Sequence, residues 1–159
     1  RVVCGADIDI VIGDARQTMS KEQDSSFDLF IIDAFTSDAI PVHMLTAEAV
    51  KMYLDKLKPE GVVLLHTSNR YLDLDSVLGA TLKELPPGTA GIVASDTNAD
   101  RSYGQSSSTV VIFAKSEEAL APYRSIDGVV DLDDGGLRAW TDDYSDILGP
   151  FMNRFRGRG

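Results

Sequence analysis

The stretch that decides the fold class is FDLFIIDAFTSDAIPVHMLT, residues 27–46. Its first residues are almost all apolar, as in a strand that is buried on both faces in the middle of a parallel sheet. Asp33 ends this run, Asp38 follows five residues later, and Pro41 blocks a smooth continuation into a helix. A strand suited to the interior therefore delivers two carboxylates into one short loop.

Strand-like and helix-like segments alternate around this stretch. In the segment 47–58, four apolar residues fall on one helix face behind Thr46, which is a preferred N-cap residue. This order of segments predicts an α/β sheet that is parallel at first and ends in an antiparallel pair. We expect strands at 8–15, 27–34, 61–68, 89–96 and 108–115, and helices at 47–58, 72–85 and 117–124.

Polar residues directly follow several of the expected strands. Asp14, Asp33, the segment 66–69 and Asp96 all stand at strand ends. In open parallel sheets, ligands bind beyond the carboxyl ends of the strands. We therefore expect these residues to line one edge of the sheet.

Other residues that carry chemistry suggest structural roles. His43 and His66 have no partner at the spacing of a metal site or a catalytic triad, so we expect them to pack or to face solvent. Asp142 and Asp143 are expected to cap a helix. Two His and one Cys are too few for a zinc site, and no Gly-x-Ser-x-Gly motif of a hydrolase is present. The sequence therefore predicts no metal site.

The composition is that of one globular domain covering residues 1–159. Hydrophobic residues make up 43%, and the formal net charge is −10, which disfavours binding to nucleic acid. The single cysteine, Cys4, and the lack of a long apolar run predict a cytoplasmic protein. Several arginines near the end predict a flexible basic tail over residues 151–159.

With the strands in this order, the sequence resembles the polyamine aminopropyltransferase (spermidine synthase) family. The resemblance runs over residues 8–116 and is carried by IDIVIGDAR, by the stretch 27–46, by LKPEGVVLLHTSN and by SYGQSSSTVVIFAKS. It implies a Rossmann-like fold of the methyltransferase type. It also implies transfer of an aminopropyl group from decarboxylated S-adenosylmethionine to an amine such as putrescine, with methylthioadenosine as the by-product.

The resemblance also implies roles for residues of the amine site. Asp33 matches the catalytic aspartate of the family, and Asp38 the aspartate that holds the amine. Tyr103 and Gln105 match the residues beside the polyamine channel. Such a site has to remove a proton from the attacking nitrogen, because a protonated amine has no lone pair, and a carboxylate can accept that proton.

On the donor side, the resemblance assigns contacts with the adenine of the co-substrate to Gly13, Asp14 and Ala15. The Gly-rich turn and the acidic residue that hold the rest of the donor have no counterpart in the chain. We therefore expect the chain to be the C-terminal portion of a domain truncated at its N-terminus, to bind the donor weakly by itself, and to pair into a homodimer through an exposed sheet edge. Some relatives in the most similar bacterial branch carry a membrane domain ahead of the synthase-like part.

Two alternatives remain open on the same sequence. One is an S-adenosylmethionine-dependent methyltransferase, which shares the fold, although the loop after Asp33 has no Asn/Asp-Pro-Pro-Tyr motif. The other is a degenerate, non-catalytic relative that acts through self-association. Binding of the donor and the amine would distinguish them from an aminopropyltransferase.

Overall fold

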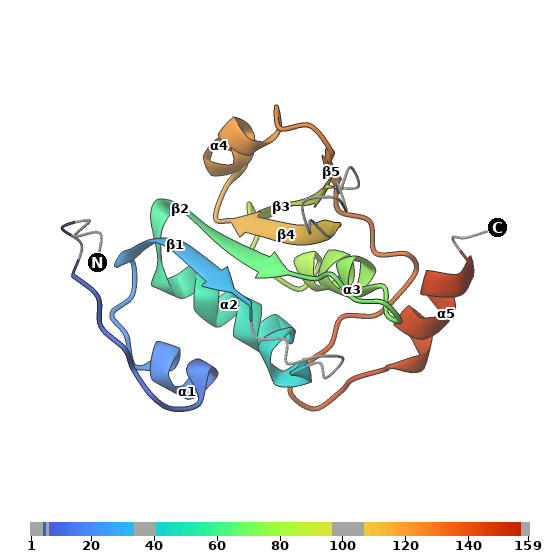
Figure 1. Ribbon diagram of the computed structural model, residues 1–159, viewed down its shortest axis with the longest axis horizontal. Coiled ribbons are helices and arrows are strands. Elements are labelled where there is room, and N and C mark those ends of the chain that lie inside the picture. The colour runs from blue at the N-terminus through green and yellow to red at the C-terminus, as the bar shows by residue number, and fades with distance from the viewer. Residues whose placement is uncertain (1–4, 6, 34–40, 97–106, 157–159) are drawn as a thin grey trace, which may run out of the picture.

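The computed structural model describes residues 5, 7–33, 41–96 and 107–156 of the chain (Figure 1). The sheet has five strands, whose neighbours follow the order β1-β2-β4-β3-β5. The strands are β1 (Phe27–Ile32), β2 (Leu57–His66), β3 (Ala90–Asp96), β4 (Ser108–Ala114) and β5 (Val129–Asp131). The helices are α1 (Ala15–Ser20), α2 (Ala47–Lys56), α3 (Leu74–Leu82), α4 (Glu117–Leu120) and α5 (Leu148–Arg156), with the short 3-10 helices η1 (Val42–Met44) and η3 (Ala121–Tyr123).

The pairing of the strands confirms the expected fold class. β1 and β2 are parallel, whereas β4 is antiparallel to both β2 and β3. A fifth strand, β5, pairs antiparallel with β3 and was not expected, since its three residues lie in a segment without a clear period. The result is a mixed α/β sheet that begins with a parallel pair.

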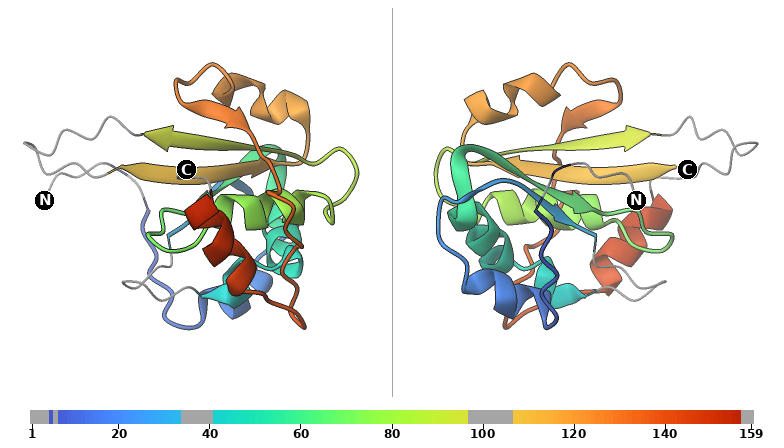
Figure 2. Two further views of the ribbon diagram at one scale, coloured as in Figure 1. Left: turned by 90° about the vertical axis from the view of Figure 1, so that its right-hand side faces the viewer. Right: turned by 60° about the vertical axis from the view of Figure 1, so that its left-hand side comes forward.

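Two layers of helices cover the sheet (Figure 2). Helices α1, α2, α3 and α5 lie on one side and α4 lies on the other. The larger core is on the first side, where Tyr53, Leu78 and Trp140 are fully buried with residues of β1 and β2. The smaller core joins Leu120 of α4 to Ile92 and Ile112. Because both faces carry a core, β2, β3 and β4 are apolar along most of their length.

Local features of the sequence explain where α2 begins and which of its faces is buried. The Thr46 side chain accepts a hydrogen bond from the backbone N–H of Ala49, as expected for an N-cap residue. The apolar face predicted from the period of the sequence, including Val50 and Tyr53, is buried. This helix therefore fixes the segment that follows the acidic loop, because η1 and Thr46 connect that loop directly to α2.

Two expected features of the N-terminal part are wrong. Residues 8–12 form no strand, and Ile10 and Ile12 have exposed fractions of 85% and 94%. β1 lies at the edge of the sheet and not in its middle, and Leu29 and Ile31 on its second face are exposed. A β-branched run becomes a strand only beside a partner strand, and no described strand lies next to residues 8–12 or on the open side of β1.

The prediction of a flexible basic tail over residues 151–159 is wrong for residues 151–156. Residues 151–156 belong to α5, so they are helical instead of a flexible extension. Pro150 of this helix is buried, and the Asn153 side chain donates to the carbonyl of Gly135. Helix α5 therefore packs back on the domain and brings Arg154 toward the end of β2. Among the described residues, no helix has the length and apolar character that crossing a membrane requires.

Candidate active site

The parallel register of β1 and β2 sets Asp33 beside His66. Ile32 lies opposite Leu65, so the next residue of each strand comes at the same carboxyl end of the pair. The Asp33 carboxylate and the His66 Nδ1 are 2.9 Å apart. The Asp33 side chain is 64% exposed, and that of His66 is 31% exposed. The pair therefore joins a half-buried imidazole to a carboxylate that a ligand can reach.

A second hydrogen bond fixes the other side of the His66 ring. The Nε2 atom is 2.8 Å from the Ser68 hydroxyl, whose oxygen in turn accepts the backbone N–H of Thr109 at 2.7 Å. Because a carboxylate can only accept, the proton of the neutral imidazole belongs on Nδ1, and Ser68 donates to Nε2. His66 is therefore held between Asp33 and the first residues of β4.

This row of Asp33, His66 and Ser68 has the spacing of a serine hydrolase triad, but Ser68 has a structural role here. Its oxygen is used by the Thr109 N–H, and its hydrogen bond to His66 completes a brace between β2 and β4. These two contacts fix Ser68 between His66 and the backbone of β4, so the arrangement holds the His66 ring beside Asp33.

We predict that the neutral His66 ring carries its proton on Nδ1 in solution. Nitrogen-15 NMR of the imidazole at about pH 9, where a model imidazole is neutral, measures this directly. Asp33→Ala removes the acceptor and should shift the ring toward the Nε2–H form, whereas Asp28→Ala on the same strand should leave it unchanged. A ring that carries its proton on Nε2 in the unmodified protein contradicts the assignment.

Asp14, the residue expected to contact the donor, caps α1. Its carboxylate accepts the backbone N–H of Gln17 at 2.9 Å, and its second oxygen lies 3.7 Å from the Nε2 of His43. Gly13 precedes this cap, and Ala15 begins the helix. Asp14 is thus beside η1, which follows the acidic loop, while Asp33 contacts β2. A carboxylate that caps a helix keeps lone pairs for a further donor.

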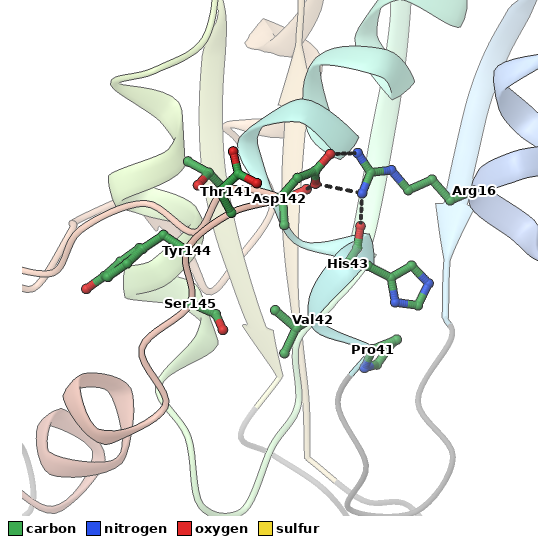
Figure 3. A pocket seen from close by; sticks show the side chains of 10 residues that line it. Arg16, Pro41, Val42, His43, Thr141, Asp142, Tyr144 and Ser145 are labelled. Carbon is green, nitrogen blue, oxygen red and sulfur yellow. Dashed lines mark hydrogen bonds and ion pairs between the residues drawn. The ribbon is translucent and has the colours of Figure 1, made fainter.

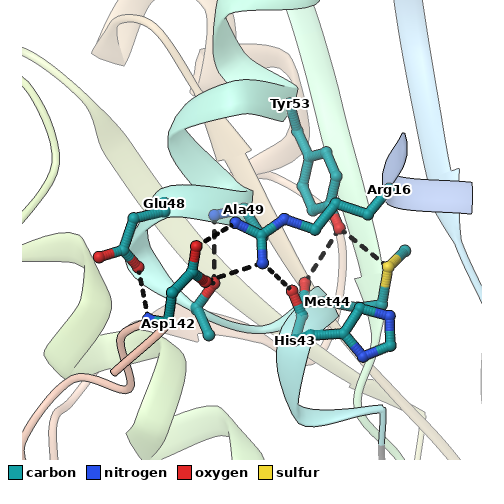
Figure 4. A network of polar contacts seen from close by, with 8 residues as sticks. Arg16, His43, Met44, Glu48, Ala49, Tyr53 and Asp142 are labelled. Atoms are coloured by element: carbon teal, nitrogen blue, oxygen red, sulfur yellow. Dashed lines mark hydrogen bonds and ion pairs between the residues drawn. The ribbon is translucent and has the colours of Figure 1, made fainter. Parts of the chain in front are cut away.

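An ion pair ties these segments together (Figure 4). The Arg16 guanidinium donates to both carboxylate oxygens of Asp142 at 2.7 Å and to the carbonyl of His43 at 2.9 Å. The Thr46 hydroxyl donates to the same carboxylate at 2.8 Å. These hydrogen bonds, above all the one from Arg16, hold the pKa of Asp142 below its ordinary value. Arg16, His43, Thr46 and Asp142 therefore join α1, η1, α2 and the turn after Trp140.

A cavity of about 580 Å³ lies against this ion pair (Figure 3). Its walls come from Arg16, the segment 41–46 and the turn 141–145. Asp142 balances the charge of Arg16 in the described wall of this cavity. His43, which also lines the cavity, lies beside Asp14.

Two expectations about individual residues need correction. His66 is a bonded neighbour of Asp33 and not merely a packing or surface residue. Asp142 does not cap a helix by itself, but binds Arg16 and the capping residue Thr46. The signal for His66 was available in the sequence, because it ends an apolar strand just as Asp33 does.

The remaining predicted residues cannot be placed. Asp38, Tyr103 and Gln105 lie outside the residues that the structure describes, so their roles stay predictions. Within the described ranges, no group of three or more His, Cys, Asp and Glu side chains is arranged to hold a metal ion. The candidate site consists of Asp33 with His66 and Ser68, and of Asp14 with His43.

Solved structures that resemble this chain include spermidine synthases. A probable spermidine synthase from Corynebacterium glutamicum ATCC 13032 matches with a TM-score of 0.53 and 16% identity, over 86% of this chain and 55% of that chain. The spermidine synthase from Thermotoga maritima matches with a TM-score of 0.50 and 18% identity, over 90% of this chain and 46% of that chain. The chain has a spermidine synthase-like fold.

This spermidine synthase-like fold spans about half the length of the two synthases. No protein-family model matches the sequence. The sequence of no curated protein matches it either. At identities of 16% and 18%, the two structures establish the fold alone.

Proposed function

We propose that this site activates an amine for aminopropyl transfer from decarboxylated S-adenosylmethionine. The observation that carries the proposal is the hydrogen bond of 2.9 Å between Asp33 and His66 at the carboxyl ends of two parallel strands. A spermidine synthase-like fold binds its ligands at this edge of the sheet. The pair supplies a carboxylate that is oriented from behind and open to solvent in front.

The proposed reaction is a nucleophilic substitution. The nitrogen lone pair of the amine attacks the propyl carbon attached to the sulfonium, a C–N bond forms, and the C–S bond breaks. The bonding electron pair of the C–S bond goes to sulfur, so that methylthioadenosine leaves as a neutral molecule. A proton on the attacking nitrogen passes to the Asp33 carboxylate, which acts as the general base. Such a base typically contributes ~10²–10⁴ in rate.

His66 positions this carboxylate in the proposed mechanism. Its Nδ1–H holds one oxygen of Asp33, so the other oxygen faces the amine with little rotational freedom. Ser68 keeps the ring in place by its contact with Nε2. We assign His66 and Ser68 as positioning residues, because among the described contacts they act through Asp33.

The donor belongs beside Asp14, at the start of α1, in this proposal. Gly13, Asp14 and Ala15 are assigned to its adenine end, as the resemblance of the sequence implies. A cavity of about 370 Å³ lined by Asp14, Arg16, Gln17, Ser20 and His43 supports this placement. The exposed carboxylate of Asp14 can accept an amino group while it caps α1.

Release of methylthioadenosine tests the proposal. The protein at its natural length is incubated with decarboxylated S-adenosylmethionine and a panel of amines, and the products are separated by liquid chromatography with mass detection. We expect methylthioadenosine and an aminopropylated amine in equal amounts, and neither product without the amine. Methyl transfer from S-adenosylmethionine, or no product with any amine, contradicts the proposal.

A further inference from the structure

A further polar cavity has Ser68 in its wall. It has a volume of about 480 Å³ and lies between the end of β2, the start of β4, α3 and α5. Ser68 and Thr109, which support His66 from behind, are part of its wall. Of the described residues that line it, Leu72 alone is an aliphatic hydrophobic residue. The cavity thus shares Ser68 with the candidate site and no described lining residue with the cavity beside Asp14.

Two arginines contribute positive charge to the wall of this cavity. Arg70 and Arg154 both line it, and neither has an ion pair among the described residues. The Nε atom of Arg154 is buried and makes no hydrogen bond there. Buried polar groups in folded proteins are nearly always bonded, and an unmade bond is costly. Arg154 therefore lines the cavity with one guanidinium nitrogen left without a partner among the described residues.

The described wall also holds one carboxylate, Asp75, which interacts electrostatically with Arg154. Asp75 accepts a hydrogen bond from the Thr67 hydroxyl, and burial raises the pKa of Asp75 above its ordinary value. No ion pair joins Asp75 to either arginine among the contacts that the structure describes. Two guanidinium groups and one carboxylate give the described lining a net positive charge, within a chain whose formal net charge is −10.

We infer that this cavity binds a carboxylate, and that the amine activated by Asp33 carries that carboxylate at its far end. The planar guanidinium of Arg154 suits a carboxylate, which can accept two parallel hydrogen bonds. The acceptor would be an amino acid-like zwitterion and not a simple diamine. This inference rests on the proposed function, because it assigns the amino end of the ligand to Asp33.

Binding of matched amines without the donor tests the inference. 4-Aminobutanoate and butylamine have the same chain length and amino group, but only the first has a carboxylate. We expect 4-aminobutanoate to bind roughly tenfold more tightly, as one charge-assisted hydrogen bond allows. Titrations followed by the amide NMR signals of Ser68 and Thr109 measure the two affinities in the millimolar range.

Two variants in α5 test whether the preference for a carboxylate comes from the cavity or from the overall charge of the protein. Arg154→Met removes the guanidinium with its unused donor and keeps much of the side-chain length, so it should abolish the advantage of 4-aminobutanoate. Arg156→Met removes an equal charge from an exposed residue that does not line the cavity, and the advantage should persist. Equal losses in the two variants, or no advantage in the unmodified protein, overturn the inference.

Three further outcomes distinguish carboxylate binding in this cavity from phosphate binding and from the proposed aminopropyl transfer. Inorganic phosphate that binds through Arg154 while 4-aminobutanoate does not would overturn the carboxylate assignment. Transfer to 1,4-diaminobutane without carboxylate binding would overturn the inference and leave the proposed function in place. Carboxylate binding that depends on Arg154, together with no transfer to any amine, would support the cavity and reject aminopropyl transfer.

Discussion

Asp33→Asn should lower the turnover number for aminopropyl transfer by roughly 10²–10⁴-fold, the usual contribution of a general base. Asparagine keeps the shape of the side chain, and its carbonyl oxygen can still accept the Nδ1–H of His66. It cannot accept a proton from the attacking amine. Because binding of the amine does not depend on that proton transfer, the Michaelis constant should change much less than the turnover number.

The matched control for this substitution is Asp28→Asn. Asp28 lies on the same strand but pairs with Lys58, away from the candidate site, and its side chain is 81% exposed. We expect its turnover number to stay within about twofold of the unmodified protein, since exposed ion pairs contribute little. Equal activity of the two variants, measured by steady-state kinetics of methylthioadenosine release, would show that Asp33 is not the base.

Trp140→Ala should cause the largest loss of stability among single substitutions that leave the candidate site intact. Trp140 is fully buried in the larger core, and its indole N–H donates to the carbonyl of Asp146 at 3.1 Å. Truncation of a buried aromatic residue leaves a cavity and costs about 3–5 kcal/mol. A domain of this size has a total stability of about 5–15 kcal/mol, so much of it would be lost.

Urea unfolding followed by circular dichroism measures this loss. Fluorescence is unsuitable, because the substitution removes the single tryptophan of the chain. Ile126→Ala is the control. Because Ile126 is 51% exposed, this substitution should lower the free energy of unfolding by no more than roughly 0.5 kcal/mol. A loss of less than about 1 kcal/mol for Trp140→Ala would mean that the segment around Trp140 is not packed as the structure has it.

The sequence predicted those features that local chemistry determines. Helix α2 has a capping residue and an apolar face, so its start and its buried face followed from its own sequence. Its end did not, because the helix stops at Lys56 and the expected Pro-Gly stop lies inside β2. The end of β1 at Asp33 was equally clear, because an apolar run gives way there to an acidic loop. Both predictions needed no knowledge of the neighbouring segments.

The sequence could not predict the features that depend on neighbours. The run at residues 8–12 has the composition of a strand, but pairing requires a partner and none lies beside it among the described strands. The Asp33–His66 contact depends on the register between β1 and β2, which a sequence does not give. The unused Nε of Arg154 is known only once α5 packs against the end of β2.

The ion pair between Arg16 and Asp142 also has a consequence for the order of assembly. Its partners are 126 residues apart, so a chain leaving the ribosome cannot make it until almost all of the domain has been synthesised. Before that point, η1 and the α2 cap lack the carboxylate that holds them against α1. The segment from η1 to Thr46 therefore becomes fixed late, so that nascent or C-terminally clipped chains leave it open to proteases and chaperones.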